Sequence, residues 1–310
     1  MKTLSRLVLQ LYHEIKIDWQ MHPARLYRIL GIPGPPVSSV SGADQPPVDT
    51  ARLALVTAID FAIKTVEELA ELCGGLIKEA IEMDANLVVF PPETGELLLQ
   101  LAPCEGKRVY RRLQAAHFPF WSGLARKYQV WLIAGCQTLN YQGYNRKAAF
   151  LFGPQGQCGK QYKVHLTVEE KKAGYLPGRE VQVWPTAVGP LALCFYGEEQ
   201  YFELGRIIAA KGGKILVSLV TPGAALQTDQ ITGGWARAQE NPIYFVGGTN
   251  VFAPTELSID GSGIVDQSES SSQRLILVNL DLTKLTESDQ GPMLARRLCA
   301  TYLPRLYFEH

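Results

Sequence analysis

Short apolar runs alternate with stretches of helical periodicity from residue 51 to residue 282. The apolar runs, each of which predicts a strand, cover residues 51–59, 86–90, 130–137, 147–156, 190–196, 214–220, 243–250 and 274–282. Apolar residues that recur every three to four positions, as from Val66 to Ala80, predict helices between these strands. Several strands are too apolar to face water, so we expect an α/β fold in which helices cover a mostly buried sheet.

Three further helices are expected, at residues 107–127, 202–211 and 235–239. Pro119 lies inside the first of them. Because proline lacks the backbone N–H that an interior helical position donates, it should start, kink or break that helix.

The first fifty residues differ from the rest of the chain. Apolar residues at helical spacing predict an amphipathic helical extension over 1–30, which either packs on its own domain or docks a protein partner. Its polar face is not rich in Lys and Arg, which argues against a membrane-surface role. Residues 31–50 are dense in Pro, Gly and Ser and predict a linker. We therefore expect the folded domain over 51–285, and a tail over 286–310 that packs on the domain or on a neighbouring subunit.

Composition and charge argue against several functions. Thirty basic residues balance thirty acidic ones, so the chain lacks an electrostatic footprint for nucleic acid. No run reaches the roughly 18 apolar residues of a membrane span. Six cysteines without CxxC spacing predict reduced thiols in a cytoplasmic protein, and five dispersed histidines give no support for a metal site. The glycine-rich segments fit neither nucleotide-binding motif, so we expect no cofactor.

Two segments place charged groups after predicted strands. Glu93 follows strand 86–90 and two prolines, and a carboxylate there can act as a general base if apolar surroundings raise its pKa. Lys163 precedes Glu169 and Glu170, and a lysine held in a pocket can stabilise a developing oxyanion while a nearby carboxylate keeps it charged. Taken alone, each of these side chains is more often a solvated surface charge.

Two other segments carry weaker signals. Residues 190–206 combine an apolar strand, an abrupt Tyr-Gly-Glu turn and a helix, which is the geometry by which α/β enzymes expose a nucleophile. A plain strand–helix connection is an equally good local interpretation. Arg237 and Glu240 lie three residues apart on a predicted helix and are expected to pair.

Together, the order and spacing of these four segments resemble those of the carbon-nitrogen hydrolase (nitrilase) superfamily, over roughly residues 51–285. FPPE resembles the family's Phe-Pro-Glu motif, GKQYKVHL is similar to its Tyr-x-Lys-x-His-Leu motif, and RAQEN is similar to its Arg-Ala-x-Glu-Asn motif. The resemblance puts Lys163 in the catalytic lysine position and Glu169 in that of an auxiliary glutamate.

The resemblance implies a four-layer αββα sandwich that assembles as a homodimer or a higher homo-oligomer. It also implies a reaction in which a cysteine thiolate attacks an amide, nitrile or carbamoyl carbon. A glutamate then serves as general base and acid, and the lysine stabilises the tetrahedral intermediate. No cofactor takes part.

The sequence departs from this pattern at two catalytic positions. A gapless count back from Glu203, which resembles the start of the family's next helix, places Tyr196 at the cysteine position, and Gly189 upstream agrees. A phenol has an ordinary pKa of about 10 against about 8.5 for a thiol, and a phenolate attacks amides poorly. A gapless count also puts Pro92 on the family's glutamate, so Glu93 serves only if an insertion or a bulge is allowed.

Three functions remain open from the sequence. The first is a catalytically silent protein of this fold that binds a small molecule or a protein partner. The second is an active hydrolase with Cys194 as nucleophile alongside Glu93 and Lys163, because strand alternation puts positions 194 and 196 on one face, toward one pocket. The alternative for Cys194 is a buried core thiol. The third is a structural role dominated by residues 1–30.

Overall fold

The computed structural model describes residues 2–32, 49–57, 62–102, 107–141, 143–156, 158–221, 231–265 and 274–285. Most of the predicted linker and all of the predicted tail lie outside these ranges. Where the sequence predicts an amphipathic extension, the chain forms α1 (Lys2–Gln20) and α2 (Pro23–Leu30).

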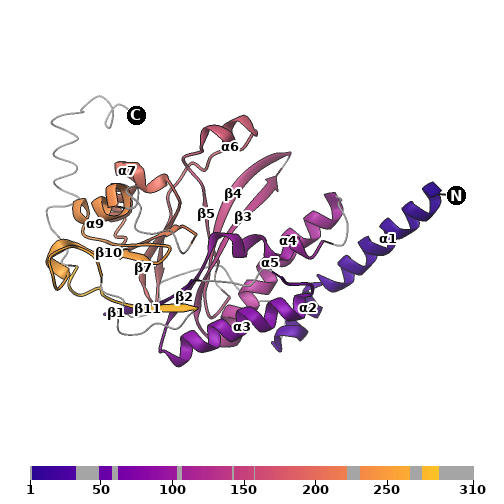
Figure 1. Ribbon diagram of the computed structural model, residues 1–310, viewed down its shortest axis with the longest axis horizontal. Coiled ribbons are helices and arrows are strands. Elements are labelled where there is room, and N and C mark those ends of the chain that lie inside the picture. The colour runs from indigo at the N-terminus through magenta and orange to yellow at the C-terminus, as the bar shows by residue number, and fades with distance from the viewer. Residues whose placement is uncertain are drawn as a thin grey trace.

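The described residues form two β-sheets (Figure 1). The first has the order β11-β1-β2-β3-β4-β5, with strands β1 (Thr50–Val56), β2 (Leu87–Phe90), β3 (Trp131–Tyr141), β4 (Tyr144–Phe152), β5 (Cys158–Tyr162) and β11 (Leu275–Asp281). The second has the order β10-β9-β8-β7-β6, with strands β6 (Val183–Thr186), β7 (Gly189–Phe195), β8 (Ile215–Leu219), β9 (Tyr244–Gly247) and β10 (Asn250–Phe252). Strands β1, β2 and β3 are parallel, and so are β7, β8 and β9.

Helices and short helical turns connect these strands. The α-helices are α3 (Val66–Glu82), α4 (Leu97–Gln100), α5 (Lys107–Tyr128), α6 (Val168–Lys172), α7 (Phe202–Ala210) and α9 (Ala236–Glu240). The short turns are η2 (Pro92–Glu96), η3 (Glu198–Gln200), η4 (Ile231–Trp235) and η5 (Thr255–Leu257).

Strand alternation divides the side chains of each sheet between two cores. In β1, Leu53 and Leu55 point into the core between the two sheets, whereas Ala54 points into the core beneath α3 and α5. In β7, Leu193 joins the core between the sheets, and Ala192 packs with Leu204 of α7 on the other face. The order of layers is therefore helix, sheet, sheet, helix, which confirms the predicted αββα sandwich.

Of the predicted effects of Pro119, the start and the break of the helix are wrong, because α5 runs through that residue from Lys107 to Tyr128. An interior proline removes one intrahelical hydrogen bond. The next two side chains, Phe120 and Trp121, are fully buried, and the apolar area they remove from water outweighs the lost bond.

Helix α1 projects away from the sandwich (Figure 1). Its C-terminal half packs on α5 through buried Ile17 and through Asp18, which pairs with Arg108 at 3.0 Å and with Arg112 at 2.7 Å. Five large apolar side chains on one face of this helix are exposed, and we call them the α1 stripe: Val8, Leu11, Tyr12, Ile15 and Trp19. No helix in the described part of the chain is both long enough and apolar enough to cross a membrane.

Candidate functional site

A pocket of about 620 Å³ lies where the parallel strands of the two sheets end. In α/β folds, the carboxyl ends of parallel strands are the usual place for a binding or catalytic site. The lining residues are Pro92, Cys136, Lys147, Lys163, Thr167, Glu169, Glu170, Phe195, Tyr196, Leu219, Val220 and Thr221. Of the predicted site residues, the pocket therefore brings together Lys163, Glu169 and Tyr196.

The turn η2 holds the Pro-Pro-Glu segment close against β3. The two are so near that a Cβ on Gly135, which has φ +68°, would lie 2.5 Å from the carbonyl oxygen of Pro91. Glycine is therefore required at this bulge. The close approach aims Pro92 at the pocket, while Glu93 is exposed and accepts a hydrogen bond from the hydroxyl of Thr221, which lines the pocket at the end of β8. Glu93 itself does not line the pocket.

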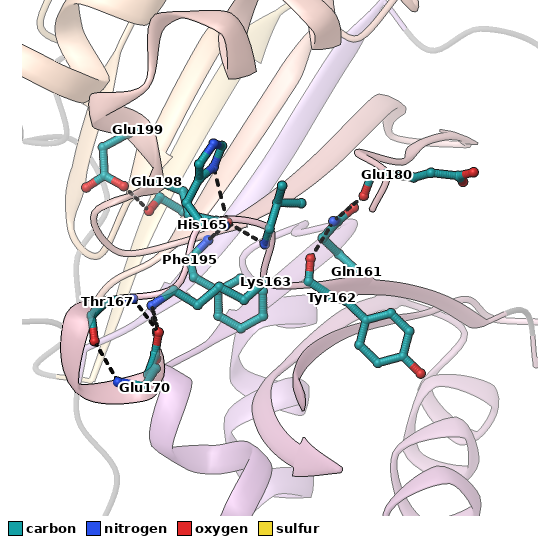
Figure 2. A network of polar contacts seen from close by, with 12 residues as sticks. Gln161, Tyr162, Lys163, His165, Thr167, Glu170, Glu180, Phe195, Glu198 and Glu199 are labelled. Carbon is teal, nitrogen blue, oxygen red and sulfur yellow. Dashed lines mark hydrogen bonds and ion pairs between the residues drawn. The ribbon is translucent and has the colours of Figure 1, made fainter. Parts of the chain in front are cut away.

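Lys163 directly follows β5, and its side chain is only 7% exposed. Its Nζ lies 3.0 and 3.1 Å from the two carboxylate oxygens of Glu170, at the start of α6 (Figure 2). A capping box fixes this glutamate, because Thr167 accepts from the Glu170 backbone and Glu170 accepts from the Thr167 backbone at 2.9 Å. The carboxylate that holds Lys163 is thus Glu170, whereas Glu169 lines the pocket with an exposed side chain.

A second lysine reaches the same carboxylate from β4. Ala148 pairs with Tyr162 in the antiparallel ladder, so Lys147 and Lys163 come next to each other just beyond it, joined by a 3.0 Å backbone hydrogen bond. Nζ of Lys147 lies 2.9 Å from Glu170 Oε1. Like charges on neighbouring strands repel, and Glu170 offsets that repulsion by lying between them. Lys147 is not among the residues that the sequence predicts for the site, because only the pairing of β4 with β5 brings it beside Lys163.

The charges of this cluster support one another. Burial acts to raise the pKa of Glu170, but the hydrogen bonds from Lys147, from the Thr167 backbone and from Lys163 lower it to about 2. Burial acts to lower the pKa of Lys147, but its hydrogen bond to Glu170 leaves that pKa above the ordinary value. At neutral pH the carboxylate is therefore ionised between two ammonium groups.

Glu198 connects the loop that follows β5, which begins at Lys163, to the end of β7. Its buried carboxylate accepts backbone N–H groups from Val164 and His165, both at 2.7 Å, and from Phe195 at 2.9 Å (Figure 2). Burial raises the pKa of Glu198, and the three N–H donors act against that rise. Because Phe195 precedes Tyr196, this one side chain sets the position of Tyr196 relative to Lys163.

The prediction that Cys194 and Tyr196 face one pocket is wrong. Tyr196 lines the pocket, but β7 ends at Phe195 and Gly197 turns the chain with φ +88°, so strand alternation does not extend to Tyr196. Cys194 is 0% exposed and packs with Leu204 beneath α7. The thiol therefore lies outside the pocket lining. Burial also raises the pKa of Cys194 well above the ordinary value, so the thiol is protonated at neutral pH.

Another thiol does line the pocket. Cys136 lies on β3 just after the bulge at Gly135, and sequence analysis did not single it out. Burial raises the pKa of Cys136 to about 12, and the carboxylates of Glu96 and Glu93 add to that rise while Lys147 opposes it. The group is therefore a neutral thiol at pH 7.

The arginine of the RAQEN motif, Arg237, holds helix α9 against the turn η3. Arg237 is buried and pairs with Glu240 at 3.1 Å, which confirms the predicted pair. It also donates to the backbone carbonyl of Glu199 at 3.1 Å, so it fastens α9 to the turn that follows Tyr196. Among the described residues, no group of three or more His, Cys, Asp or Glu side chains is placed to hold a metal ion.

The carbon-nitrogen hydrolase family model matches residues 52–276, and the chain belongs to that family. A probable hydrolase, YhcX of Bacillus subtilis, is 26% identical over 76% of this chain, which spans about half (51%) of that protein's length. A protein named nitrilase from Pyrococcus abyssi is 30% identical, covering 61% of this chain and 71% of its own.

Solved structures of two family members share the fold. A carbon-nitrogen hydrolase from Helicobacter pylori G27 aligns with a TM-score of 0.60 at 18% identity, over 84% of this chain and 99% of that one. An amidase from Nesterenkonia sp. aligns with a TM-score of 0.57 at 19% identity, over 83% of this chain and 99% of that one.

Proposed function

We propose that this protein binds a small molecule in the pocket beside Lys163 and does not hydrolyse it by the thiol chemistry of its family. The observation that carries this proposal is the place of Tyr196, which lines the pocket directly after β7 while the nearest cysteine of that strand, Cys194, is buried beneath α7. In this proposal Tyr196 stands at the nucleophile position. A phenol at that place does not replace a thiolate.

The second catalytic position supports the same proposal. Pro92, not Glu93, lines the pocket, and the Glu93 carboxylate is exposed and bonded to Thr221. An exposed carboxylate lacks the apolar surroundings that tune a general base. Lys163 and Glu170 form a buried ion pair in the pocket lining, and the exposed Glu169 also lines the pocket. These charged groups can recognise a polar ligand.

Active hydrolysis of amides or nitriles is the alternative, and the names of the Nesterenkonia amidase and the Pyrococcus nitrilase give its substrate class. It requires Cys194 to leave the core beneath α7, or the neutral thiol of Cys136 to act as the nucleophile. Either cysteine would have to ionise to a thiolate, and burial disfavours that ionisation.

Ammonia release separates the two functions. Wild type, Cys194→Ala, Cys136→Ala and Tyr196→Cys are each incubated with a panel of short amides, nitriles and carbamoyl amino acids. We expect no turnover by wild type or by the two alanine variants, and activity, if any, only with Tyr196→Cys. Wild-type turnover that disappears in Cys194→Ala or Cys136→Ala would contradict the proposal.

We propose in addition that the chain forms a homodimer or a higher homo-oligomer, and that residues 1–30 provide one of its protein contacts through the α1 stripe. The stripe supports this because five large apolar side chains are exposed along one helix face. A net charge of zero also removes long-range repulsion between copies. The described cysteines Cys73, Cys136, Cys158 and Cys194 are free thiols, which supports a reducing, cytoplasmic location.

Light scattering on a size-exclusion column tests the contact. We expect the molar mass of wild type to exceed that of one chain, and a Leu11→Ser/Ile15→Ser variant to lower it. Lys16→Ser, on the same helix but outside the stripe, should leave the mass unchanged. A wild-type protein that elutes as a single chain at all concentrations would contradict the assembly proposal.

A further inference from the structure

Two lysines and one glutamate of the pocket lining form a single cluster of charges. Two ammonium groups, on Lys147 and Lys163, lie within 3.1 Å of one carboxylate, that of Glu170. That carboxylate also accepts the Thr167 backbone N–H at 2.9 Å, so both of its oxygens are already engaged. Within this cluster two ammonium groups therefore face one carboxylate, and the other carboxylate of the pocket lining is that of Glu169.

The two lysines differ in how they face the pocket. Lys163 is 7% exposed and held by both oxygens of Glu170. Lys147 is 36% exposed and contacts one oxygen, Glu170 Oε1, at 2.9 Å. An ammonium group has three donors, so Lys147 can donate to a ligand while it keeps its bond to Glu170.

The remaining walls limit what that ligand can be. Leu219, Val220 and Phe195 form an apolar side at the ends of β7 and β8. The negative charge of Glu169 faces the same pocket from its exposed edge, where solvent screens it more than it screens the buried cluster. A small ligand with an anionic end and an apolar body matches this distribution.

We propose that the pocket recognises small organic carboxylates, with Lys147 as the residue that binds the carboxylate and Leu219 and Val220 as the wall for the apolar chain. The proposal rests on the small-molecule binding proposed above and names its ligand class. It assigns to Lys147 a preference for a carboxylate over the uncharged amide of the same shape.

Hexanoate and hexanamide are the probes, because they differ only in the charged group. Isothermal titration calorimetry at low salt measures both with wild type, Lys147→Met, Lys147→Arg and Lys160→Met. Lys160 is the matched control, since it is an exposed lysine on β5 outside the pocket lining. Melting temperatures establish that each variant is folded.

We expect wild type to bind hexanoate at least tenfold more tightly than hexanamide. Lys147→Met should bring the two affinities together, while Lys147→Arg and Lys160→Met should keep the preference. Equal affinities in wild type, a preference that survives in Lys147→Met, or failure of wild type to bind either probe would each overturn the inference. Release of ammonia from hexanamide would instead count against the proposed function, and the hexanoate comparison would still test Lys147.

Discussion

At the scale of single residues, the Lys147–Glu170–Lys163 cluster fixes the chemistry of the pocket. Glu170 is 10% exposed and is the shared counter-charge of both lysines. Removing one partner of a buried ionic group is costly because it leaves charge uncompensated in a poorly solvated place. We therefore expect the two adjacent glutamates, Glu169 and Glu170, to contribute very differently to the free energy of unfolding.

We predict that Glu170→Gln lowers the free energy of unfolding by about 3 kcal/mol, the usual scale for breaking a buried ion pair. Glu169→Gln, one position away on an exposed side chain, should change it by no more than about 0.5 kcal/mol. Urea denaturation at pH 7 gives both values. Equal effects of the two substitutions would show that Glu170 is not the counter-charge.

His117 gives the fold a dependence on pH. It is fully buried among Trp121, Phe150 and Phe152, and burial lowers its pKa to about 3. The unfolded pKa is higher, about 6.5, so the unfolded chain binds the proton more tightly. The stability from neutral His117 is therefore complete above about pH 6.5 and is lost as the pH falls toward about 3.

For the wild type, this single histidine should cost about 2 kcal/mol of stability at pH 5 relative to pH 8. His117→Leu removes the titrating group, so its stability should fall less steeply over the same range. Chemical denaturation of both proteins at several pH values measures the difference in slope. Parallel slopes would mean that His117 does not titrate on unfolding.

Sequence alone located Lys163 and Tyr196 in the pocket, because motif spacing sets their distance from strand ends. It left two interpretations of Cys194 open, and the buried core thiol is the one confirmed, because β7 ends at Phe195 and the chain turns at Gly197. It missed Lys147 because only the pairing of β4 with β5 brings that residue beside Lys163. Long-range pairing of this kind leaves no local signal.

At the scale of elements, apolar periodicity predicted the buried strands and missed the short polar ones. The runs at 86–90 and 214–220 correspond to β2 and β8. Strand β5, with the sequence CGKQY, and strand β6, which contains Pro185, lack that apolar signal. Both lie at sheet edges, where one neighbour is enough and proline is tolerated.

Helix α1 is attached to the sandwich mainly by its C-terminal half. Ile17 is 1% exposed against α5, whereas Ile15, two residues earlier, is 60% exposed. We predict that Ile17→Ala speeds amide hydrogen exchange throughout α1 by about tenfold or more, because a buried isoleucine contributes about 2 kcal/mol or more to its docking. Lys16→Ala, at an exposed position outside the α1 stripe, should leave exchange unchanged. Equal exchange in the two variants would place the anchor elsewhere.

At the scale of the whole molecule, the αββα sandwich brings the ends of the parallel strands of two mixed sheets together at one pocket. Glu93 follows a strand of the first sheet, and Tyr196 follows a strand of the second. In the proposed function, the cysteine thiolate of the family would stand at that junction. In this chain the junction holds a tyrosine, two lysines and a neutral Cys136.

Hydrolysis by thiol chemistry would leave an acyl group on a cysteine, and mass spectrometry detects such a group directly. Wild type is mixed with hexanamide, and samples are quenched in acid at early and late times. Intact-protein and peptide mass spectrometry then show whether a cysteine is modified. We predict an unmodified protein at every time point, with a hexanoyl adduct, if one forms at all, only in Tyr196→Cys. A hexanoyl thioester on Cys194 or Cys136 of the wild type would contradict it.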